Sequence, residues 1–460
     1  MSNLISEMEE SGRYVRRGGE GYDEARRAWQ LAADLHPAVV AFPRDPQEVA
    51  TVVRRAASDA LRVAPIATGH QARALGDLDA SVLLWTSGMT GVTIDRTDRR
   101  ARVHGGDTWL PVVQQAAQDG LAALHGSAAE VGVIGYSLSG GIGWYARAYG
   151  LAANYVTAIE LVLADGRRMR VDAQHEPALF WALRGGGAGN FGVVTALEFD
   201  LFPITTAYAG ALIWDLSDAS TVLPRWAEWS ATAPESVTTS YRHVQFPPIP
   251  ELPEPLRGRR LVIIDGAILE DDDDKAARLL SALRDLKPEM DTFSRQSAET
   301  LNQLHLDPDQ PTGSVGGTAG LFDALPTAAT DRLLEVAGPD SGTPLLVPVE
   351  IRQLGGVLSR EHPGGGVLNQ LDGQFLIFNT TFATDPEQTA QAVVDTGRLT
   401  TAMTRWANGR EYLPFVEEPM DTSAAFPPAD FAELRRIRTE VDPTALFQSS
   451  HEIPQLRPPV

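Results

Sequence analysis

Residues 125–151 read HGSAAEVGVIGYSLSGGIGWYARAYGL, the densest glycine series of the chain. Closely spaced glycines let the backbone approach a ligand, and successive N–H groups can bind a pyrophosphate. The series contains Gly141-x-Gly143-x-x-Ala146, a relaxed dinucleotide fingerprint. The preceding GYSLSG is a poor buried strand, so we exclude a nicotinamide Rossmann site. A set of tight turns without any ligand is the other interpretation.

Two further stretches extend this pattern. Residues 181–199, WALRGGGAGNFGVVTALEF, form a second glycine-rich patch. Upstream, residues 64–77 read APIATGHQARALGD, where His70 directly follows Thr68 and Gly69. Nothing in the folding of this turn requires a histidine. Alone, His70 reads as a turn residue satisfied by solvent, whereas the three stretches together favour a cofactor site.

Four motifs along the chain resemble those of a known family. PIATGHQ, EVGVIGYSLSGGIGWYARAYGL, LFWALRGGGAGNFGVVTALEFDLFP and DPTALFQSSHEIP follow one another in the order seen in flavoproteins of the vanillyl-alcohol oxidase superfamily. They look most like the berberine-bridge-enzyme-like branch, which carries a PCMH-type FAD-binding domain. The resemblance covers nearly the whole chain and implies an FAD-linked oxidoreductase.

The resemblance assigns a role to His70. In that family the histidine at this place is bonded covalently to the 8α-methyl group of FAD, and the preceding backbone amides meet the pyrophosphate. A tether prevents loss of the cofactor that performs the redox step. The residues that the resemblance places at the cofactor are Ala67, Thr68, Gly69, His70, Gln71, Val131, Gly132, Gly135, Tyr136, Gly140, Gly141, Gly143, Asn190 and Val194.

The chain departs from the family at three places. Relatives commonly carry an arginine at the histidine turn, which reads Ile66-Ala67-Thr68-Gly69-His70 here. Many relatives attach the flavin through a cysteine as well, but that position is Ala128 and the chain has no cysteine. We therefore expect a single tether through His70. The RGGGAGNFG loop is one residue longer than usual.

Three residues are candidates for catalysis. Glu350 and Arg352 share one face of a predicted strand, where a charged pair is costly unless it faces a cavity or is well paired. Glu350 resembles an acidic residue that some relatives place over the flavin, and a plain salt bridge is the alternative. Tyr412 falls near a family motif in which a tyrosine serves as base or orients the substrate, although Pro414 replaces its asparagine. Tyr136 occupies a place beside the flavin in relatives and would bind the flavin or merely pack.

Tyr241 and His243 share one face of the predicted strand SYRHVQF. They could line a substrate site, but we favour ordinary packing against the sheet.

The periodicity predicts an α+β fold with a two-part FAD-binding domain and a substrate domain. Asp45, Pro46 and Glu48 mark the start of one early helix. Residues 207–382 hold five long strand candidates, YAGALIWDL, VTTSYRHVQF, RRLVIIDGAILE, PLLVPVEIRQLGG and GQFLIFNTTF, with helical stretches between them. This order predicts an antiparallel sheet covered by helices on one face. We expect an FAD-binding domain over 1–205, a substrate domain over 206–410 and a C-terminal segment, 411–460, that returns to the FAD-binding domain.

Composition excludes several function classes. The chain has 460 residues with Asp+Glu 60 against Lys+Arg 39, a formal net charge of −21 that disfavours nucleic-acid or membrane partners. Without cysteine there is no disulfide, thiolate metal site or cysteine nucleophile. No G-x-S-x-G elbow and no metal-ligand spacing occurs, so we expect neither a hydrolase nor a metal site. No signal peptide or long apolar run is found, which favours a cytoplasmic protein.

We predict an FAD-dependent oxidase that takes a hydride from a small organic or natural-product substrate to flavin N5. Tyr412 or Glu350 would take a proton, and oxygen would reoxidise the flavin to give hydrogen peroxide. A dehydrogenase or an oxidative cyclase that does not use oxygen is one alternative. A flavin-binding protein without turnover is another. The substrate and the oligomeric state cannot be predicted from the sequence.

Overall fold

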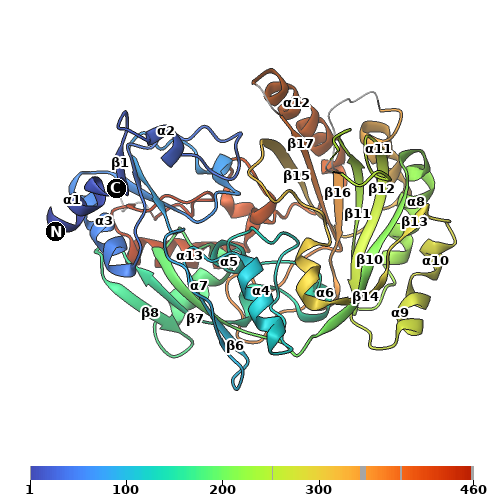
Figure 1. Ribbon diagram of the computed structural model, residues 1–460, viewed down its shortest axis with the longest axis horizontal. Coiled ribbons are helices and arrows are strands. Elements are labelled where there is room, and N and C mark those ends of the chain that lie inside the picture. Colours follow the sequence, from blue (N-terminus) through green and yellow to red (C-terminus); the bar gives the residue numbers. More distant parts are fainter. Residues whose placement is uncertain (1, 251, 342–348, 384–385, 457–460) are drawn as a thin grey trace.

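The structure, a computed structural model, describes residues 2–250, 252–341, 349–383 and 386–456. It is mixed helix and sheet, built around three sheets (Figure 1). Two smaller sheets make up the first part of the chain and one large sheet the second. The predicted α+β class is confirmed.

The first sheet has the order β1-β2-β4-β3, formed by β1 (Tyr14–Arg16), β2 (Val39–Ala41), β4 (Ser81–Trp85) and β3 (Arg62–Ile66). β2, β4 and β3 run parallel, and α3 (Pro46–Ser58) connects β2 to β3. The predicted start of α3 is confirmed, because the Asp45 side chain accepts hydrogen bonds from the amides of Gln47 and Glu48. Helices α1 (Ser2–Glu10) and α2 (Tyr22–Ala25) flank this sheet.

The second sheet is antiparallel throughout, with the order β5-β6-β9-β7-β8. Its strands are β5 (Thr93–Asp95), β6 (Arg100–His104), β7 (Val156–Val162), β8 (Arg168–Asp172) and β9 (Val193–Asp200). Helices α4 (Trp109–Gln118), α5 (Val133–Leu138), α6 (Ala146–Tyr149) and α7 (Pro177–Gly186) accompany it. α5 lies inside the glycine-rich series, so GYSLSG is helical rather than a strand.

The large sheet follows the order β13-β10-β12-β11-β16-β17-β15, with β14 paired to β10. Its strands are β10 (Thr206–Asp215), β11 (Val237–Gln245), β12 (Arg260–Ile268), β13 (Met290–Asp291), β14 (Ser294–Ser297), β15 (Ser314–Phe322), β16 (Val349–Gln353) and β17 (Phe375–Phe382). Every pairing is antiparallel. The predicted antiparallel sheet is confirmed, although residues 344–348 of the fourth candidate lie outside the described residues.

Three strands of the large sheet, β13, β14 and β15, escaped the sequence prediction, and β15 is the longest of them. β15 reads SVGGTAGLF, and its three glycines hide any alternation of apolar and polar residues. At Gly316 the backbone lies close to Glu417, because a Cβ at this position would be 2.8 Å from its carboxylate. The amide of Gly316 donates to that carboxylate at 2.8 Å.

Helices cover one face of the large sheet (Figure 1). They are α8 (Ala219–Ser230), α9 (Asp273–Leu279), α10 (Ser281–Arg284), α11 (Thr327–Ala337) and α12 (Pro386–Met403). Apolar side chains of these helices and of the sheet form one core cluster that includes Trp226 and Tyr241. The opposite face of the sheet is turned toward the first part of the chain.

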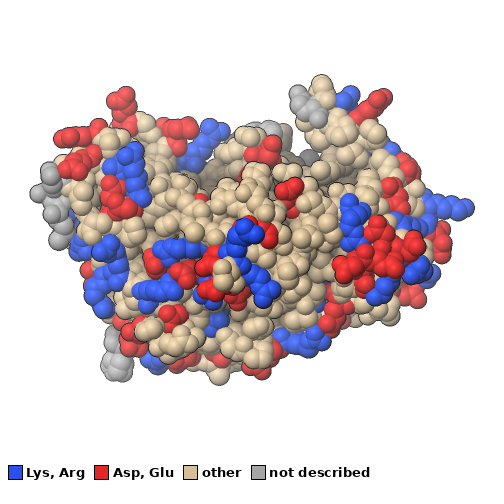
Figure 2. Space-filling model, turned by 60° about the horizontal axis from the view of Figure 1, so that its bottom comes forward, with Lys and Arg blue, Asp and Glu red and all other residues tan. Residues whose placement is uncertain are grey.

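Acidic side chains gather on the side that carries α9 and α10 (Figure 2). The run Asp271–Asp274 is exposed and begins α9, with Asp272 as its N-cap accepting from the amide of Lys275. Negative charge at a helix N-terminus is favourable. The run is therefore a solvated helix start.

The C-terminal tail returns to the first sheet after α13 (Pro428–Val441). Phe447 forms a parallel bridge with Val63 of β3, and the amide of Gln448 donates to the carbonyl of Val63 at 2.8 Å. We propose domain boundaries at 205/206 and 410/411. The contacts of Phe447 and Gln448 with Val63 support a C-terminal segment that belongs to the FAD-binding part.

None of the described helices is long and apolar enough to cross a membrane.

Candidate active site

The predicted cofactor stretches meet where the parallel strands of the first sheet end. The His70 turn directly follows β3, and Gly132 lies beside it, since a Cβ on Gly132 would be 3.3 Å from the Cβ of Ala67. The second patch also reaches β3, because a Cβ on Gly189 would be 3.4 Å from Pro65. Ligands of such sheets bind outside the carboxyl ends of the strands. The structure thus brings three separate stretches to one place.

The turn at residues 67–71 has a backbone suited to an anion. Gly69 has φ of +87°, and a Cβ there would lie 2.7 Å from the Cβ of Ala28, so only glycine fits. The carbonyls of Thr68 and Gly69 accept from the amides of Trp29 and Gln30. Within the described residues, the amides of Thr68, Gly69 and His70 donate to no protein acceptor. Free amides in succession are what a pyrophosphate requires.

His70 is held in a defined orientation. Its ring stacks on Trp29 with centroids 4.7 Å apart, and its Nδ1 lies 2.8 Å from the hydroxyl of Thr68. Burial lowers the pKa of His70 to about 4, while the nearby Asp307 opposes this shift. The imidazole is therefore neutral at physiological pH, the form that has a nucleophilic nitrogen. The neighbouring Gln71 donates its side-chain amide to the carbonyl of Leu413 at 2.9 Å.

Tyr136 projects from α5 and packs against Gly126 and Gly141 of the glycine series. Its buried hydroxyl has no hydrogen-bond partner among the described residues. This hydroxyl is therefore available to a water molecule or to a group outside the chain. Gly135, one residue earlier, has no atom within 4 Å of its Cβ position. The free amides, the unpartnered hydroxyl and the open glycine face fit the FAD that the sequence implies.

Three other predicted glycines are explained by contacts within the protein. A Cβ on Gly140 would lie 3.0 Å from the Tyr412 hydroxyl, and one on Gly141 would lie 2.6 Å from the Tyr136 ring. A Cβ on Gly143 would lie 2.0 Å from the carbonyl oxygen of His125. These glycines let two tyrosines pack against the loop, and an approach of cofactor to them stays a prediction.

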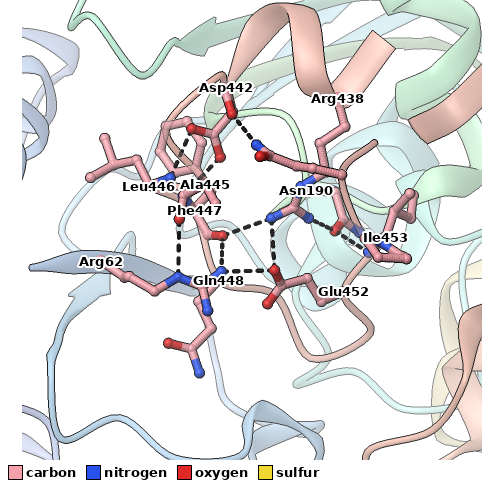
Figure 3. A network of polar contacts seen from close by, with 12 residues as sticks. Arg62, Asn190, Arg438, Asp442, Ala445, Leu446, Phe447, Gln448, Glu452 and Ile453 are labelled. Atoms are coloured by element: carbon pink, nitrogen blue, oxygen red, sulfur yellow. Dashed lines mark hydrogen bonds and ion pairs between the residues drawn. The ribbon is translucent and has the colours of Figure 1, made fainter. Parts of the chain in front are cut away.

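The side chain of Asn190 is engaged by the tail (Figure 3). Its Nδ2 donates to the carbonyls of Gly186 and His451, both at 2.9 Å, and its Oδ1 accepts from Arg438 and from the amide of Ile453. These four bonds use its hydrogen-bonding capacity. The side chain of Asn190 therefore positions the loop, and a contact between this residue and the cofactor stays a prediction. The side chain of Val194 is likewise buried, in the core of the second sheet.

Tyr412 lies against the glycine series. Its hydroxyl accepts from the amide of Gly141 at 2.9 Å. Burial raises the pKa of Tyr412, while the Gly141 hydrogen bond and the positive charge of Arg352 lower it in part. Burial and Tyr412 raise the pKa of Tyr136, and Arg352 again opposes. The positive charge of Arg352 thus acts on the pKa of both tyrosines.

Glu350 and Arg352 form a paired charge on the sheet face that looks toward the first part of the chain. Arg352 donates through Nε to Oε1 of Glu350 at 2.6 Å and through Nη2 to Ser127 Oγ at 3.1 Å. Ser127 belongs to the glycine series and contacts Asp307 at 3.2 Å. The salt-bridge interpretation of Glu350 is confirmed, and the same contacts also place the pair at the loop predicted to hold the cofactor.

Sequence reasoning missed several neighbours of Glu350. His305 lies 3.4 Å from Oε1 of Glu350 and 2.9 Å from Oδ2 of Asp265, and Asp265 is also paired with Arg242. Asp265 carried a usable signal, because it is a charged residue within the apolar strand RRLVIIDGAILE. His305 carried none, since it lies in a loop whose position only the tertiary structure sets.

Tyr241 and His243 point the other way. They bond to each other at 2.7 Å and are buried beneath the helices with Trp226. The favoured interpretation of ordinary packing is confirmed.

Comparison with known proteins supports the cofactor assignment. Residues 37–172 match a family model described as an FAD binding domain. The chain is 32% identical over 214 residues to (R)-6-hydroxynicotine oxidase of Paenarthrobacter nicotinovorans, which is 46% of each protein. The chain spans about half the length of the curated relatives it matches.

Solved structures share the fold over nearly the whole chain. 6-Hydroxy-D-nicotine oxidase of Arthrobacter nicotinovorans superposes with a TM-score of 0.80 at 22% identity, covering 94% of this chain and 96% of that one. A BBE-like protein of Physcomitrella patens gives 0.85 at 18% identity, covering 99% and 100%. Residues 37–172 are thus similar to an FAD binding domain, and the fold shared with these solved structures extends over nearly the whole chain.

Proposed function

We propose that the protein is an FAD-dependent oxidase acting on a small organic or natural-product substrate. One observation carries this proposal: Tyr412 and the Glu350–Arg352 pair bind the glycine series at Gly141 and Ser127, and Gly141 also lies against the ring of Tyr136. The named activities of relatives, on hydroxynicotine and on oligosaccharides, agree with a small-molecule substrate.

The cofactor would be attached through one bond only. His70 is the residue we assign to that bond, supported by its neutral imidazole and by its place beside the free amides of the turn. Ala128 offers no second attachment. The chemistry that bound FAD supplies is acceptance of a hydride from the substrate and reoxidation by oxygen to hydrogen peroxide.

Tyr412 is the residue we assign to proton transfer. Its hydroxyl accepts from Gly141, which leaves its own O–H free to reorient toward a substrate oxygen or nitrogen. Burial raises the pKa of the phenol, and the Gly141 hydrogen bond and Arg352 offset only part of that rise. Tyr136 would hold its free hydroxyl toward the cofactor.

Glu350 is the less suitable proton acceptor. Burial raises the pKa of Glu350, but Arg352 and His305 together lower it by more. The pKa of Glu350 is therefore well below its usual range, and the carboxylate stays ionised. Such a carboxylate is a weak base. We assign it to fixing Arg352.

Anaerobic flavin reduction tests the proposed function. Purified holoprotein is mixed with panels of alcohols, amines, oligosaccharides and hydroxylated aromatics, and loss of flavin absorbance is followed. We expect bleaching by at least one class, with hydrogen peroxide formed when air is admitted. Bleaching that air does not reverse would favour a dehydrogenase or cyclase, and no bleaching with any class would contradict an oxidase.

A further inference from the structure

A network of charged and polar side chains lies on the face of the large sheet opposite the helices. Asp265 on β12 lies opposite Ser240 on β11, which lies opposite Arg352 on β16. Arg242 lies opposite Glu350 in the next row. All of these side chains except that of Arg352 are buried, and Arg352 is only 16% exposed. Buried charges of this kind persist only when they are paired.

His305 connects two carboxylates of this network, those of Asp265 and Glu350. It comes from the loop after the short helix η4 (Ala298–Gln303), not from the sheet. Nδ1 lies 2.9 Å from Asp265, Nε2 lies 3.4 Å from Glu350, and the ring is 3% exposed. A ring that meets a carboxylate at each nitrogen satisfies both only as an imidazolium, since a neutral imidazole has one N–H.

The charges around His305 balance when it is protonated. Asp265 and Arg242 face it from β12 and β11, Glu350 and Arg352 from β16, and Asp307 from its own loop. Burial and Arg242 lower the pKa of His305, but Asp265, Glu350 and Asp307 together raise it to about 9. Three cations then meet three carboxylates.

We propose that His305 is a positioning residue of the candidate active site: as an imidazolium it binds Asp265 and Glu350, and Glu350 in turn aims Arg352 at Ser127. The ring of His305 also lies beside that of Trp144 in the glycine series, with centroids 5.7 Å apart. His305 acts through Glu350, whose Oε1 forms an ion pair with His305 and accepts a hydrogen bond from Arg352. The orientation of Arg352 over the Phe415 ring, 5.0 Å from the centroid, depends on the same anchor.

This inference rests on the proposed function only in naming the place as the substrate site. The network itself is defined by contacts within the chain. Its test therefore uses readouts that need no turnover.

The first measurement is the protonation state of His305 in the FAD-loaded protein. Long-range proton–nitrogen spectra of protein labelled with ¹⁵N-histidine separate imidazolium from neutral rings. We expect one buried histidine to stay doubly protonated at about pH 8, well above the ordinary histidine pKa. Its signal should vanish in His305→Gln. A spectrum with no doubly protonated histidine at that pH would overturn the proposal, even if the variant failed to fold.

The second measurement is the Nε–H signal of Arg352, assigned with Arg352→Lys. A charge-assisted hydrogen bond moves this signal downfield, and His305→Gln should move it back toward that of an exposed arginine. An unchanged signal would contradict the positioning role. His243→Gln is the matched control: burial lowers the pKa of His243 to about 4, and its loss should leave both signals in place. Absence of any oxidase activity would overturn the proposed function and leave these results standing.

Discussion

The hydroxyl of Tyr412 accepts a 2.9 Å hydrogen bond from the amide of Gly141, although 271 residues separate the two in sequence. The contact joins the C-terminal segment to the glycine series of residues 125–151. A side chain on Gly140 would meet the Tyr412 ring, and one on Gly141 would meet the ring of Tyr136.

Replacing Tyr412 by phenylalanine should affect both stability and chemistry. The buried amide of Gly141 loses its acceptor, which costs about 1–3 kcal/mol of unfolding free energy. Loss of a positioned proton acceptor should slow flavin reduction by roughly 10²–10⁴-fold. Tyr136→Phe is the matched comparison, because its hydroxyl has no partner in the described protein and its removal should leave stability unchanged. Stopped-flow reduction and thermal unfolding of both variants measure the two effects. An equal loss of stability in both would contradict the assignment.

The single tether predicts that flavin stays with the protein after acid denaturation. The peptide that contains His70 should be heavier by one FAD, and His70→Ala should release its flavin on denaturation while still binding it when folded. His175→Ala is the control, since that ring is exposed and its loss should change nothing. Mass spectrometry of the digested protein decides. Free flavin from the unmodified protein would refute the tether.

Two glycines should respond in opposite ways to alanine. Gly143→Ala forces a Cβ to within 2.0 Å of the His125 carbonyl, so unfolding free energy should fall by at least about 2 kcal/mol. Gly135→Ala meets no protein atom within 4 Å and lies in α5, so stability should hold or rise by up to about 1 kcal/mol.

The effect of Gly135→Ala on FAD affinity shows whether FAD lies against Gly135. If FAD passes over Gly135, the added methyl should weaken non-covalent binding by roughly 5- to 150-fold, equivalent to about 1–3 kcal/mol of overpacking. The measurement compares FAD affinity of His70→Ala with that of His70→Ala/Gly135→Ala. Equal affinities would remove Gly135 from the cofactor site.

The tail depends on one buried arginine. Arg438 is fully buried and binds Asn190, the carbonyl of Phe447 and Glu452 (Figure 3). Arg438→Met should therefore lower the free energy of unfolding by about 2–4 kcal/mol. Arg436→Ala, on the exposed side of the same helix with Glu433 and Glu440, should change it by less than about 1 kcal/mol. Denaturant unfolding gives both values, and similar losses in the two variants would contradict the role of Arg438 in holding the tail.

Stability should fall as pH rises from neutral. The pKa of His305 is raised to about 9 in the folded protein, against about 6.5 unfolded, so its contribution is full below about pH 6.5 and is lost as pH passes about 9. The loss is on the order of 1–3 kcal/mol. Calorimetry between pH 6 and pH 10 should show this decline in the unmodified protein and a flatter profile in His305→Gln. Parallel profiles would contradict a charged His305.

Local patterns in the sequence determined much of this protein. The spacing of glycines around His70 and at residues 125–151, the cap at Asp45, and the alternating strands of residues 207–382 each depend on neighbours within a few positions. Such features set the fold class and pointed to the cofactor turn. β15 escaped because its three glycines leave no periodicity, and one of them, Gly316, lies against the distant carboxylate of Glu417.

Only the tertiary structure decided how charges and hydroxyls are shared. That Asn190 serves the tail, that Tyr412 bonds Gly141, and that His305 joins Asp265 to Glu350 depend on strand register and loop placement over long sequence separations. The protonation of a buried side chain is set by which partners surround it, and no sequence window contains those partners. The sequence named Glu350 and Arg352 as a pair, and the fold supplied the histidine that holds the pair in place.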